Sequence, residues 1–253
     1  MPALYETSAA LHPVRHGFFG RAGGASQGVY AGNNMSFTTG DDSATVVGNR
    51  AGVANIMGYD AAHLVILKQT HSADVHVVTG PLPADAVIEA DAMVTDRPGL
   101  LLGILTADCT PILFADLQAG VIGAAHAGWR GAVTGICEAT IAAMVNLGAH
   151  PARIAAAIGP TISGPNYEVG PQFAAELLAA HPQAGNRIST PPAGVEHFDL
   201  PGFVADCLAA AGIRSIDRVG TCTYGAPERY FSHRYATHHA IRTGRQVSVI
   251  GLA

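Results

Sequence analysis

The sequence predicts a fold of the α/β (α+β) class, in which helices pack on mixed β-sheets. One observation is a hairpin signal, since the apolar runs PILFADL and VIGAAHA flank a Gln118-Ala119-Gly120 turn. A second is the alternation of strand-like and alanine-rich helical runs in the second half of the chain. A third is the lack of a G-x-G-x-x-G segment after the first strand and of a G-x-x-x-x-G-K-[ST] loop, so a Rossmann or P-loop fold is not expected.

The amino-terminal part is expected to contain short strands, one long loop and one helix. A strand at 17–19 leads into a segment rich in Gly, Asn, Ser and Thr, which is typical of an ordered loop. Residues 44–57 are expected to form a helix that is broken at Gly58. The runs HLVILKQTH and SADVHVVTG then predict two strands joined by a turn.

The remaining elements follow the same two periodicities. DAMVTDRPGLLLGILTAD predicts two strands around an Arg97-Pro98-Gly99 turn, ahead of the hairpin. In AVTGICEATIAAMVNLG the apolar residues recur at spacings of three and four, which predicts an amphipathic helix that ends at Gly148. IAAAIGP predicts a buried strand, PQFAAELLAAHP and LPGFVADCLAAAGI predict helices, and IDRVGTCTY and RQVSVIGL predict the final strands.

Composition indicates a single domain, residues 1–253, that acts on small molecules. A chain of 253 residues with 49% hydrophobic content can bury a large core, and no linker-like stretch divides it. The net charge of −5 and the lack of a basic cluster argue against nucleic acid, and no run approaches the roughly 20 apolar residues that cross a membrane. The first residues do not resemble a signal peptide, and the four cysteines are scattered, so we expect a reduced, cytoplasmic protein.

The predicted hairpin brings Cys109 and His126 together. If Asp116 faces Val121 across the turn, Pro111 lies opposite His126, and Cys109 lies two residues further along. With strands about 4.8 Å apart, the two α-carbons would be separated by roughly 8 Å. That separation suits a metal ion bridging the thiolate and the imidazole, and it equally suits a direct thiol–imidazole hydrogen bond.

Two neighbouring features add to this candidate site. His71 lies in a polar turn at the end of a strong strand, which favours a functional role over a role in the core. The Gly-Trp-Arg-Gly turn at 128–131 precedes a predicted helix, whose first N–H groups can bind an anion with help from Arg130. The alternative is that Trp129 simply packs and Arg130 is solvated.

Five blocks of the sequence resemble those of the multicopper-oxidase-like laccase-domain family, whose members include the bacterial peptidoglycan editing factor and mammalian FAMIN. The blocks are LKQTHSADVHVV, EADAMVTDRPGLLLGILTADCTPILFAD, GAAHAGWRGAVTGI, AIGPTISGPNYEVG and TCTY…RYFSHR…TGRQ. The resemblance implies a CNF1/YfiH-like fold and a zinc-dependent purine nucleoside phosphorylase. It implies adenosine, inosine, guanosine and methylthioadenosine as substrates, with phosphate, and an adenosine deaminase activity.

The resemblance also implies site residues. The family's zinc ligands fall on His71, Cys109 and His126, which leave a fourth position open as in catalytic zinc sites. Arg21 and Asn34 match a second conserved block, and with Arg130 they are candidates for binding substrate or phosphate. Gly20, Asn33 and Asn166 depart from the family pattern, which leaves the preferred nucleoside open.

Other functions compete with this interpretation. The deaminase signature H-x-E with P-C-x-x-C is absent, and Asp108 is the candidate for the proton shuttle of a deamination. A copper-dependent polyphenol oxidase is disfavoured because no H-x-H pair occurs. A hydrolase with a Cys109–His126 dyad would suit the editing of a peptidoglycan precursor. A metal-binding partner without enzymatic activity is a further alternative, against which the open metal position argues.

Overall fold

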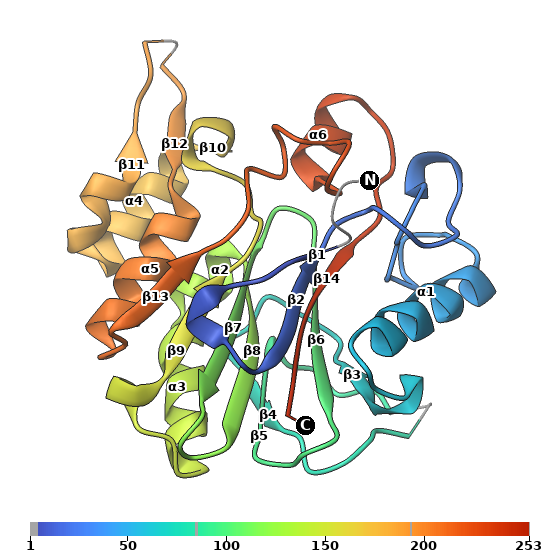
Figure 1. The fold of residues 1–253 in the computed structure, drawn as a ribbon. Helices are drawn as coiled ribbons and strands as arrows, with labels where there is room; N and C mark the ends of the chain where they lie inside the picture. The colour runs from blue at the N-terminus through green and yellow to red at the C-terminus, as the bar shows by residue number, and fades with distance from the viewer. Residues whose placement is uncertain (1–4, 84–85, 193, 253) are drawn as a thin grey trace.

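A computed structural model describes residues 5–83, 86–192 and 194–252. The elements form four layers, with a helix, two sheets and a pair of helices packed in succession (Figure 1). Each of the two large sheets contains both parallel and antiparallel pairs of strands, and helices cover the outer faces of these two sheets. The predicted fold class, mixed sheets with packed helices, is therefore confirmed.

The first sheet has five strands in the order β1-β2-β14-β6-β3. β14 is antiparallel to both β2 and β6, while β3 is parallel to β6. The chain therefore ends in the middle of the sheet that it begins. The strands are β1 (Tyr5–Glu6), β2 (Arg15–Phe19), β3 (Leu64–Ile66), β6 (Leu101–Thr106) and β14 (Gln246–Gly251).

The second sheet has six strands in the order β13-β9-β7-β8-β5-β4. Its central hairpin pairs Asp116 with Val121 and Pro111 with His126, so the register derived from the sequence is confirmed. The strands are β4 (Val75–Val77), β5 (Ala92–Thr95), β7 (Thr110–Asp116), β8 (Val121–Ala127), β9 (Ala155–Ile158) and β13 (Ser215–Arg218).

Six α-helices and a small third sheet complete the described structure. The small sheet has the order β10-β12-β11 and stands beside α4 and α5 (Figure 1). The helices are α1 (Ser43–Ile56), α2 (Trp129–Val133), α3 (Ile136–Asn146), α4 (Pro171–Ala180), α5 (Leu200–Ala210) and α6 (His233–His238). The small strands are β10 (Glu168–Val169), β11 (Ile188–Ser189) and β12 (Glu196–Phe198).

Three hydrophobic clusters hold the layers together. The cluster between the sheets includes Phe18, Ile104 and Ile122, all at most 1% exposed. α3 and α5 pack on the outer face of the six-stranded sheet, and α1 packs on the outer face of the five-stranded sheet. Full burial of one such side chain contributes about 1.5–3 kcal/mol, so this layered core dominates the stability of the fold.

The predicted limits of the helix after the Gly-Trp-Arg-Gly turn are wrong. The structure has the five-residue α2, a break at Thr134 and Gly135, and then α3. Gly135 has φ 99°, a left-handed conformation that interrupts the helix and that glycine adopts without steric cost. The anion site expected at the start of one long helix would therefore lie at the start of α2, which has only five residues.

The strand expected at 63–71 is shorter than predicted. The run at 63–71 is a strand only as far as Ile66, because the following residues turn away from the sheet. Gln69 exchanges two hydrogen bonds with the backbone of Leu105, and the main chain of 70–72 donates to Asp91. Side chains, rather than a strand ladder, satisfy this part of the backbone.

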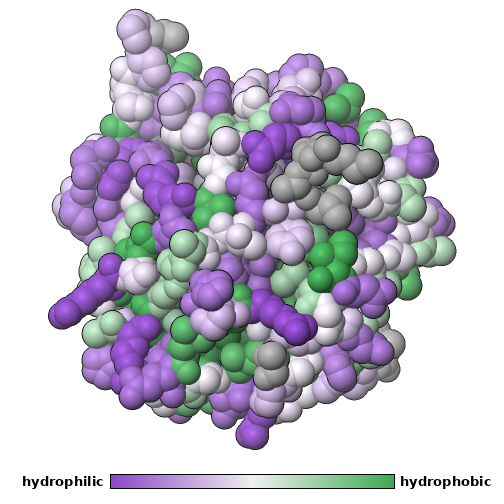
Figure 2. Space-filling view, in the orientation of Figure 1, coloured by the Kyte–Doolittle hydropathy of each residue, from purple (hydrophilic) through white to green (hydrophobic). Residues whose placement is uncertain are grey.

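The visible surface is mainly hydrophilic. In Figure 2 the hydrophobic side chains form small, separate patches among hydrophilic ones. Across the described ranges, no helix has the length and apolarity that a membrane crossing requires.

Candidate metal centre and active site

His71, Cys109 and His126 converge at one end of the layer between the two sheets. His71 lies in the loop that follows β3, Cys109 in the turn between β6 and β7, and His126 near the end of β8. Their ligand atoms all lie within 4.8 Å of one another, and Cys109 Sγ is 3.9 Å from His71 Nε2. His126 is buried, Cys109 is half-buried and His71 is exposed, so the cluster opens to solvent on the His71 side.

This set of donors fits a metal ion. One thiolate and two imidazoles are common ligands of Zn²⁺, and three protein ligands leave a fourth position for water or substrate. The two imidazole rings meet edge to face, with centroids 4.9 Å apart and an interplanar angle of 79°. The chain can therefore hold a metal ion at this place.

Asp91 holds the two histidines in position. No sequence pattern had indicated this residue. Its Oδ1 accepts hydrogen bonds from His126 Nδ1 at 2.7 Å and from the backbone N–H of His71 at 3.0 Å. Its Oδ2 accepts from the backbone N–H groups of Thr70 and Ser72 and from both their hydroxyls. One fully buried carboxylate therefore fixes both the ring of His126 and the turn that carries His71.

The bond to Asp91 sets the protonation of His126. A carboxylate can only accept, so Nδ1 carries a proton, and Nε2 is the nitrogen that can bind a metal once it has released its own proton. Metal-bound histidines in proteins commonly have such a partner, which orients the ring and raises its basicity. Asp91 is such a partner for His126.

The charges of the cluster favour the thiolate form of Cys109. Burial opposes ionisation of the thiol, but the His126 and His71 imidazoles outweigh it and lower the pKa of Cys109. Burial likewise disfavours protonated His126, but the Cys109 thiolate and Asp91 raise the pKa of that imidazole. The thiolate is the form that binds metals, so the site is prepared for a cation.

The backbone around the cluster is shaped to bring these side chains together. His71 and Asp108 have φ values of 63° and 88°, which non-glycine residues rarely adopt. Gly128 lies so close that a Cβ placed there would be 2.7 Å from His71 Cδ2 and 3.3 Å from Cys109 Sγ. Glycine is required at 128 because a side chain would displace two of the three ligands.

Asp108 supports the turn that carries Cys109. Its Oδ1 accepts from the Thr223 hydroxyl at 2.6 Å and its Oδ2 from the backbone N–H of Arg234 at 2.6 Å. The side chain is buried, and its backbone carbonyl accepts from the Thr161 hydroxyl and from Ile162 N–H. These bonds hold the strained backbone next to Cys109 and occupy both carboxylate oxygens.

Arg21 and Asn34 both lie in the segment between β2 and α1. The Arg21 guanidinium donates to the backbone carbonyls of Ala31 and Pro227 and lies on the ring of Phe231. Asn34 is fully buried, and its Oδ1 accepts from the backbone N–H of Arg245 at 2.9 Å. Arg130 is exposed and lies over the Trp129 ring at 4.6 Å.

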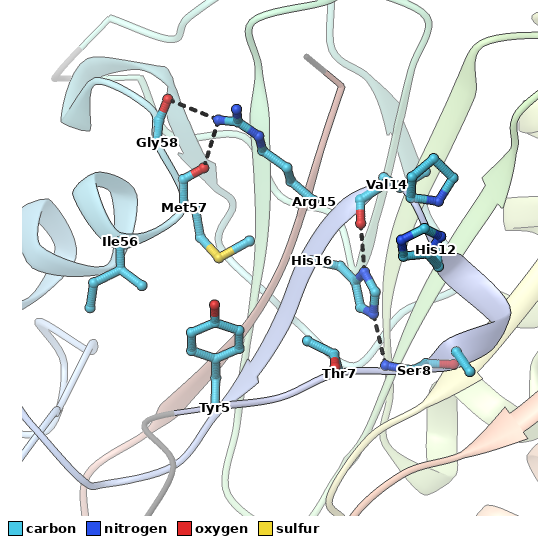
Figure 3. Close-up of a pocket in the computed structure, with 12 residues that line it drawn as sticks. Tyr5, Thr7, Ser8, His12, Val14, Arg15, His16, Ile56, Met57 and Gly58 are labelled. Atoms are coloured by element: carbon cyan, nitrogen blue, oxygen red, sulfur yellow. Dashed lines mark hydrogen bonds between the residues drawn. The ribbon is translucent and has the colours of Figure 1, made fainter.

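A separate groove of about 770 Å³ runs beside β2 and the end of α1 (Figure 3). None of His71, Cys109 and His126 lines this groove. Its polar side chains are engaged with the protein, since Arg15 donates to the carbonyls of Met57 and Gly58 and His16 bonds to Val14 and Ser8. Arg15 and His16 are therefore occupied by bonds within the protein.

The fold and the cluster together define a laccase-domain protein. Residues 15–253 match the model of the family described as multi-copper polyphenol oxidoreductase laccase, and the chain belongs to that family. The crystal structure of the Bacillus licheniformis hypothetical protein YfiH has a TM-score of 0.87 and 32% identity over 94% of this chain and 92% of that one.

The chain is also similar to proteins whose names state an enzymatic activity. Proteins named purine nucleoside phosphorylase from Deinococcus radiodurans and purine nucleoside phosphorylase ORF3 from Streptomyces griseus are 45% and 43% identical. These matches cover 99% and 92% of this chain and 94% of each relative. A protein named adenosine deaminase RL5, from an unknown prokaryotic organism, is 36% identical over 81% of this chain and 82% of its own length.

Proposed function

We propose that this protein is a zinc-dependent purine nucleoside phosphorylase. The observation that carries the proposal is the His71–Cys109–His126 triangle, with His126 held by a buried carboxylate and one side open to solvent. Relatives that share nearly the whole chain are named for this activity. The resemblance of the sequence suggests adenosine, inosine, guanosine and methylthioadenosine as the nucleosides.

The ligand set favours zinc over copper. Blue-copper centres add a weak axial ligand such as methionine to a Cys-His₂ set, and the cluster within the described residues has only three donors. When bound, a zinc ion supplies Lewis-acid chemistry at its open position. Asp91 keeps His126 Nε2 directed at that ion, and Gly128 keeps the space beside His71 and Cys109 clear.

Phosphorolysis replaces one bond at the sugar by another. An oxygen of inorganic phosphate forms a bond to C1′ of the ribose while the bond from C1′ to N9 of the purine breaks. The electron pair of that bond leaves with the purine, which takes up a proton, and the products are the free base and ribose 1-phosphate. The protein must hold the phosphate dianion close to the nucleoside, and cationic side chains such as Arg130 suit this task.

Adenosine deamination is a second proposed activity. It is favoured by the relative named adenosine deaminase RL5, which matches 81% of this chain. The reaction replaces the 6-amino group of the base by an oxygen from water and releases ammonia, so it needs no phosphate. The same three ligands serve both reactions, while only phosphorolysis requires an anion site.

We also propose that the chain forms one domain and acts in the cytoplasm. The two large sheets share one hydrophobic layer, which includes residues from both ends of the described chain. Cys109, Cys137, Cys207 and Cys222 are all free thiols, which suits a reducing compartment.

The decisive test is the phosphate dependence of base release. Zinc-loaded protein is incubated with inosine, with and without inorganic phosphate, and hypoxanthine and ribose 1-phosphate are quantified. The proposal predicts that both products form in equal amounts and only with phosphate. Base release that is independent of phosphate would exclude a phosphorylase. Hydrolysis of a peptidoglycan precursor by metal-free protein with an alkylatable Cys109 would instead support the cysteine hydrolase.

A further inference from the structure

Arg130 and Arg245, which lie on segments that adjoin the metal cluster, form no salt bridge with an acidic side chain among the described residues. Arg153, Arg187 and Arg229 each form a salt bridge of 3.1 Å or less with an acidic side chain. Within the described ranges, neither Arg130 nor Arg245 has an acidic group within 4.0 Å. A guanidinium near a functional site that is left without an anion is suited to bind one from solution.

Arg245 comes to the cluster from the start of β14. Its neighbour Gln246 pairs with Thr106 at the end of β6, three residues before Cys109. Its backbone is fixed on both sides, since its N–H donates to Asn34 Oδ1 and its carbonyl accepts from Met35 N–H. The side chain is half-buried and donates only to the adjacent carbonyl of Gly244, at 2.9 Å.

The pairing of Gln246 with Thr106 places the backbone of Arg245 beside the end of β6, close to Cys109. Burial lowers the pKa of Arg245, and the negative charges of Cys109 and Asp108 act against this lowering. Asp108 already accepts hydrogen bonds from Thr223 and Arg234. It is therefore a weak competitor for the Arg245 guanidinium.

Arg130 reaches the same region along an aromatic wall. Its guanidinium lies over Trp129, whose ring contacts Phe173 edge to face with centroids 4.9 Å apart. Phe173 contacts Phe198, and Phe198 contacts Tyr167. The wall thus runs from Arg130, directly after Gly128 and Trp129 in the chain, to the ring of Tyr167.

Tyr167 is connected to the turn that carries Cys109 through Arg234, whose backbone N–H donates to Asp108 Oδ2. The Arg234 guanidinium lies 5.3 Å from its ring and donates to the backbone carbonyl of Glu168, which holds the tyrosine in place. Burial raises the pKa of Tyr167, and Cys109, Arg234, Asp108 and Arg130 are the charged groups close enough to influence it. The hydroxyl therefore stays protonated, and the structure shows no bond from it to any described residue.

We propose that Arg130, Arg245 and the Tyr167 hydroxyl form an oxyanion subsite beside the metal cluster, and that this subsite takes inorganic phosphate. Arg234 acts as a positioning residue for Tyr167. This assignment rests on the proposed phosphorylase activity and adds two residues, Arg245 and Tyr167, that the sequence did not indicate. It replaces the short helix α2 as the source of anion binding, because two guanidiniums and a phenol supply charge and donors that one helical turn lacks.

The test uses full-length, metal-loaded protein carrying Arg245→Met, Arg245→Lys or Tyr167→Phe. Loss of a hydrogen bond to a charged group corresponds to about a 10- to 100-fold change in binding. We therefore expect Arg245→Met to raise the KM for phosphate by about that factor, with the KM for inosine within about twofold of wild type. Arg245→Lys keeps the charge and should recover part of the affinity. Arg97→Met is the matched control, since Arg97 pairs with Asp96 at the opposite end of β6.

A second readout does not depend on turnover. In protein loaded with Co²⁺, phosphate bound beside the metal shows enhanced ³¹P relaxation, which we expect to be lost in Arg245→Met and kept in Arg97→Met. An unchanged KM for phosphate and unchanged relaxation in Arg245→Met would overturn the subsite while leaving the phosphorylase intact. Phosphate binding that depends on Arg245, in a protein whose base release ignores phosphate, would keep the subsite and reject the phosphorylase.

Discussion

Replacement of Asp91 by asparagine tests how the metal site is organised, because every group around this carboxylate is a donor. Asp91 receives bonds from His126, from the main chain of 70–72 and from two hydroxyls. Asparagine has the same shape but replaces one acceptor oxygen by an NH₂ group. Either orientation of that amide places its N–H groups against N–H groups of the protein.

The two orientations have different consequences. With the NH₂ group at the Oδ2 position, the backbone N–H groups of Thr70 and Ser72 lose their acceptor. With the NH₂ group at the Oδ1 position, His126 Nδ1 must accept, and the proton moves to Nε2, where it blocks metal binding. The loss of such a partner typically costs 10- to 100-fold in metal affinity, or about 1.4–2.8 kcal/mol.

The assay is competition for zinc between the protein and a colorimetric chelator, with circular dichroism spectra confirming that the variant is folded. Glu89→Gln is the matched control, because Glu89 is exposed, lies two residues away and pairs only with Lys68 at 2.7 Å. We expect Asp91→Asn to weaken zinc binding about 10- to 100-fold and Glu89→Gln to leave zinc binding unchanged. Equal zinc affinity in Asp91→Asn and wild type would refute the role given to Asp91.

Further predictions concern the space, the acid stability and the backbone of the site. Gly128→Ala should lower zinc affinity at least tenfold, because its Cβ would lie 2.7 Å from His71 Cδ2. Gly52→Ala on α1 is the control, since its Cβ would meet no atom within 4 Å and should leave zinc affinity unchanged. Competition with a chelator compares the zinc affinities of the two variants. Burial raises the pKa of Asp116, but hydrogen bonds from Arg153 and from the backbone of His150 and Ala119 outweigh it and lower the pKa. The charged carboxylate therefore stabilises the fold at pH values above about 3.9, the pKa of Asp in an unfolded chain, and this contribution is lost at lower pH. Asp116→Asn should therefore lower the free energy of unfolding by about 1–3 kcal/mol at pH 7, and by less at pH 3, in urea titrations; a constant difference would contradict this. Thr223→Val removes a donor to buried Asp108 and should cost about 1–3 kcal/mol in the same titrations, while a neutral effect would show that Asp108 does not need this bond.

The sequence was sufficient for the parts of the structure that depend on local pattern. The apolar runs and the turn at 118–120 predicted the hairpin, and its register placed His126 opposite Pro111 as observed. Strict alternation between the arms of a hairpin leaves little freedom, so distances across it can be counted. The proximity of Cys109 and His126 follows from that counting alone.

The parts that were missed depend on contacts between distant segments. Asp91 lies between Ala90 and Ala92, and its hydrogen-bond partners come from 70–72 and 126, far away in the chain. A carboxylate directly before a buried strand was its one local signal, since such a group needs partners when the strand is packed. Arg245 and Tyr167 lie in two of the blocks that carry the family resemblance, and the pairing of β14 with β6 and the aromatic wall reveal where they lie in the fold.

The break between α2 and α3 was missed for a related reason. The spacing of apolar residues continues through Thr134 and Gly135, so periodicity shows one helix where the backbone forms two. The two-residue strands of the small sheet are likewise too short to produce an alternating pattern.

The central claim, that His71, Cys109 and His126 hold the metal that catalysis requires, is tested most directly by a metal titration. Zinc is added stepwise to metal-free protein while phosphorolysis of inosine is followed, alongside Cys109→Ala. We predict activity that rises from zero to a plateau at one equivalent of zinc, and a Cys109→Ala variant that neither binds zinc nor turns over. Full activity in the metal-free protein, or turnover retained by Cys109→Ala, would contradict this account.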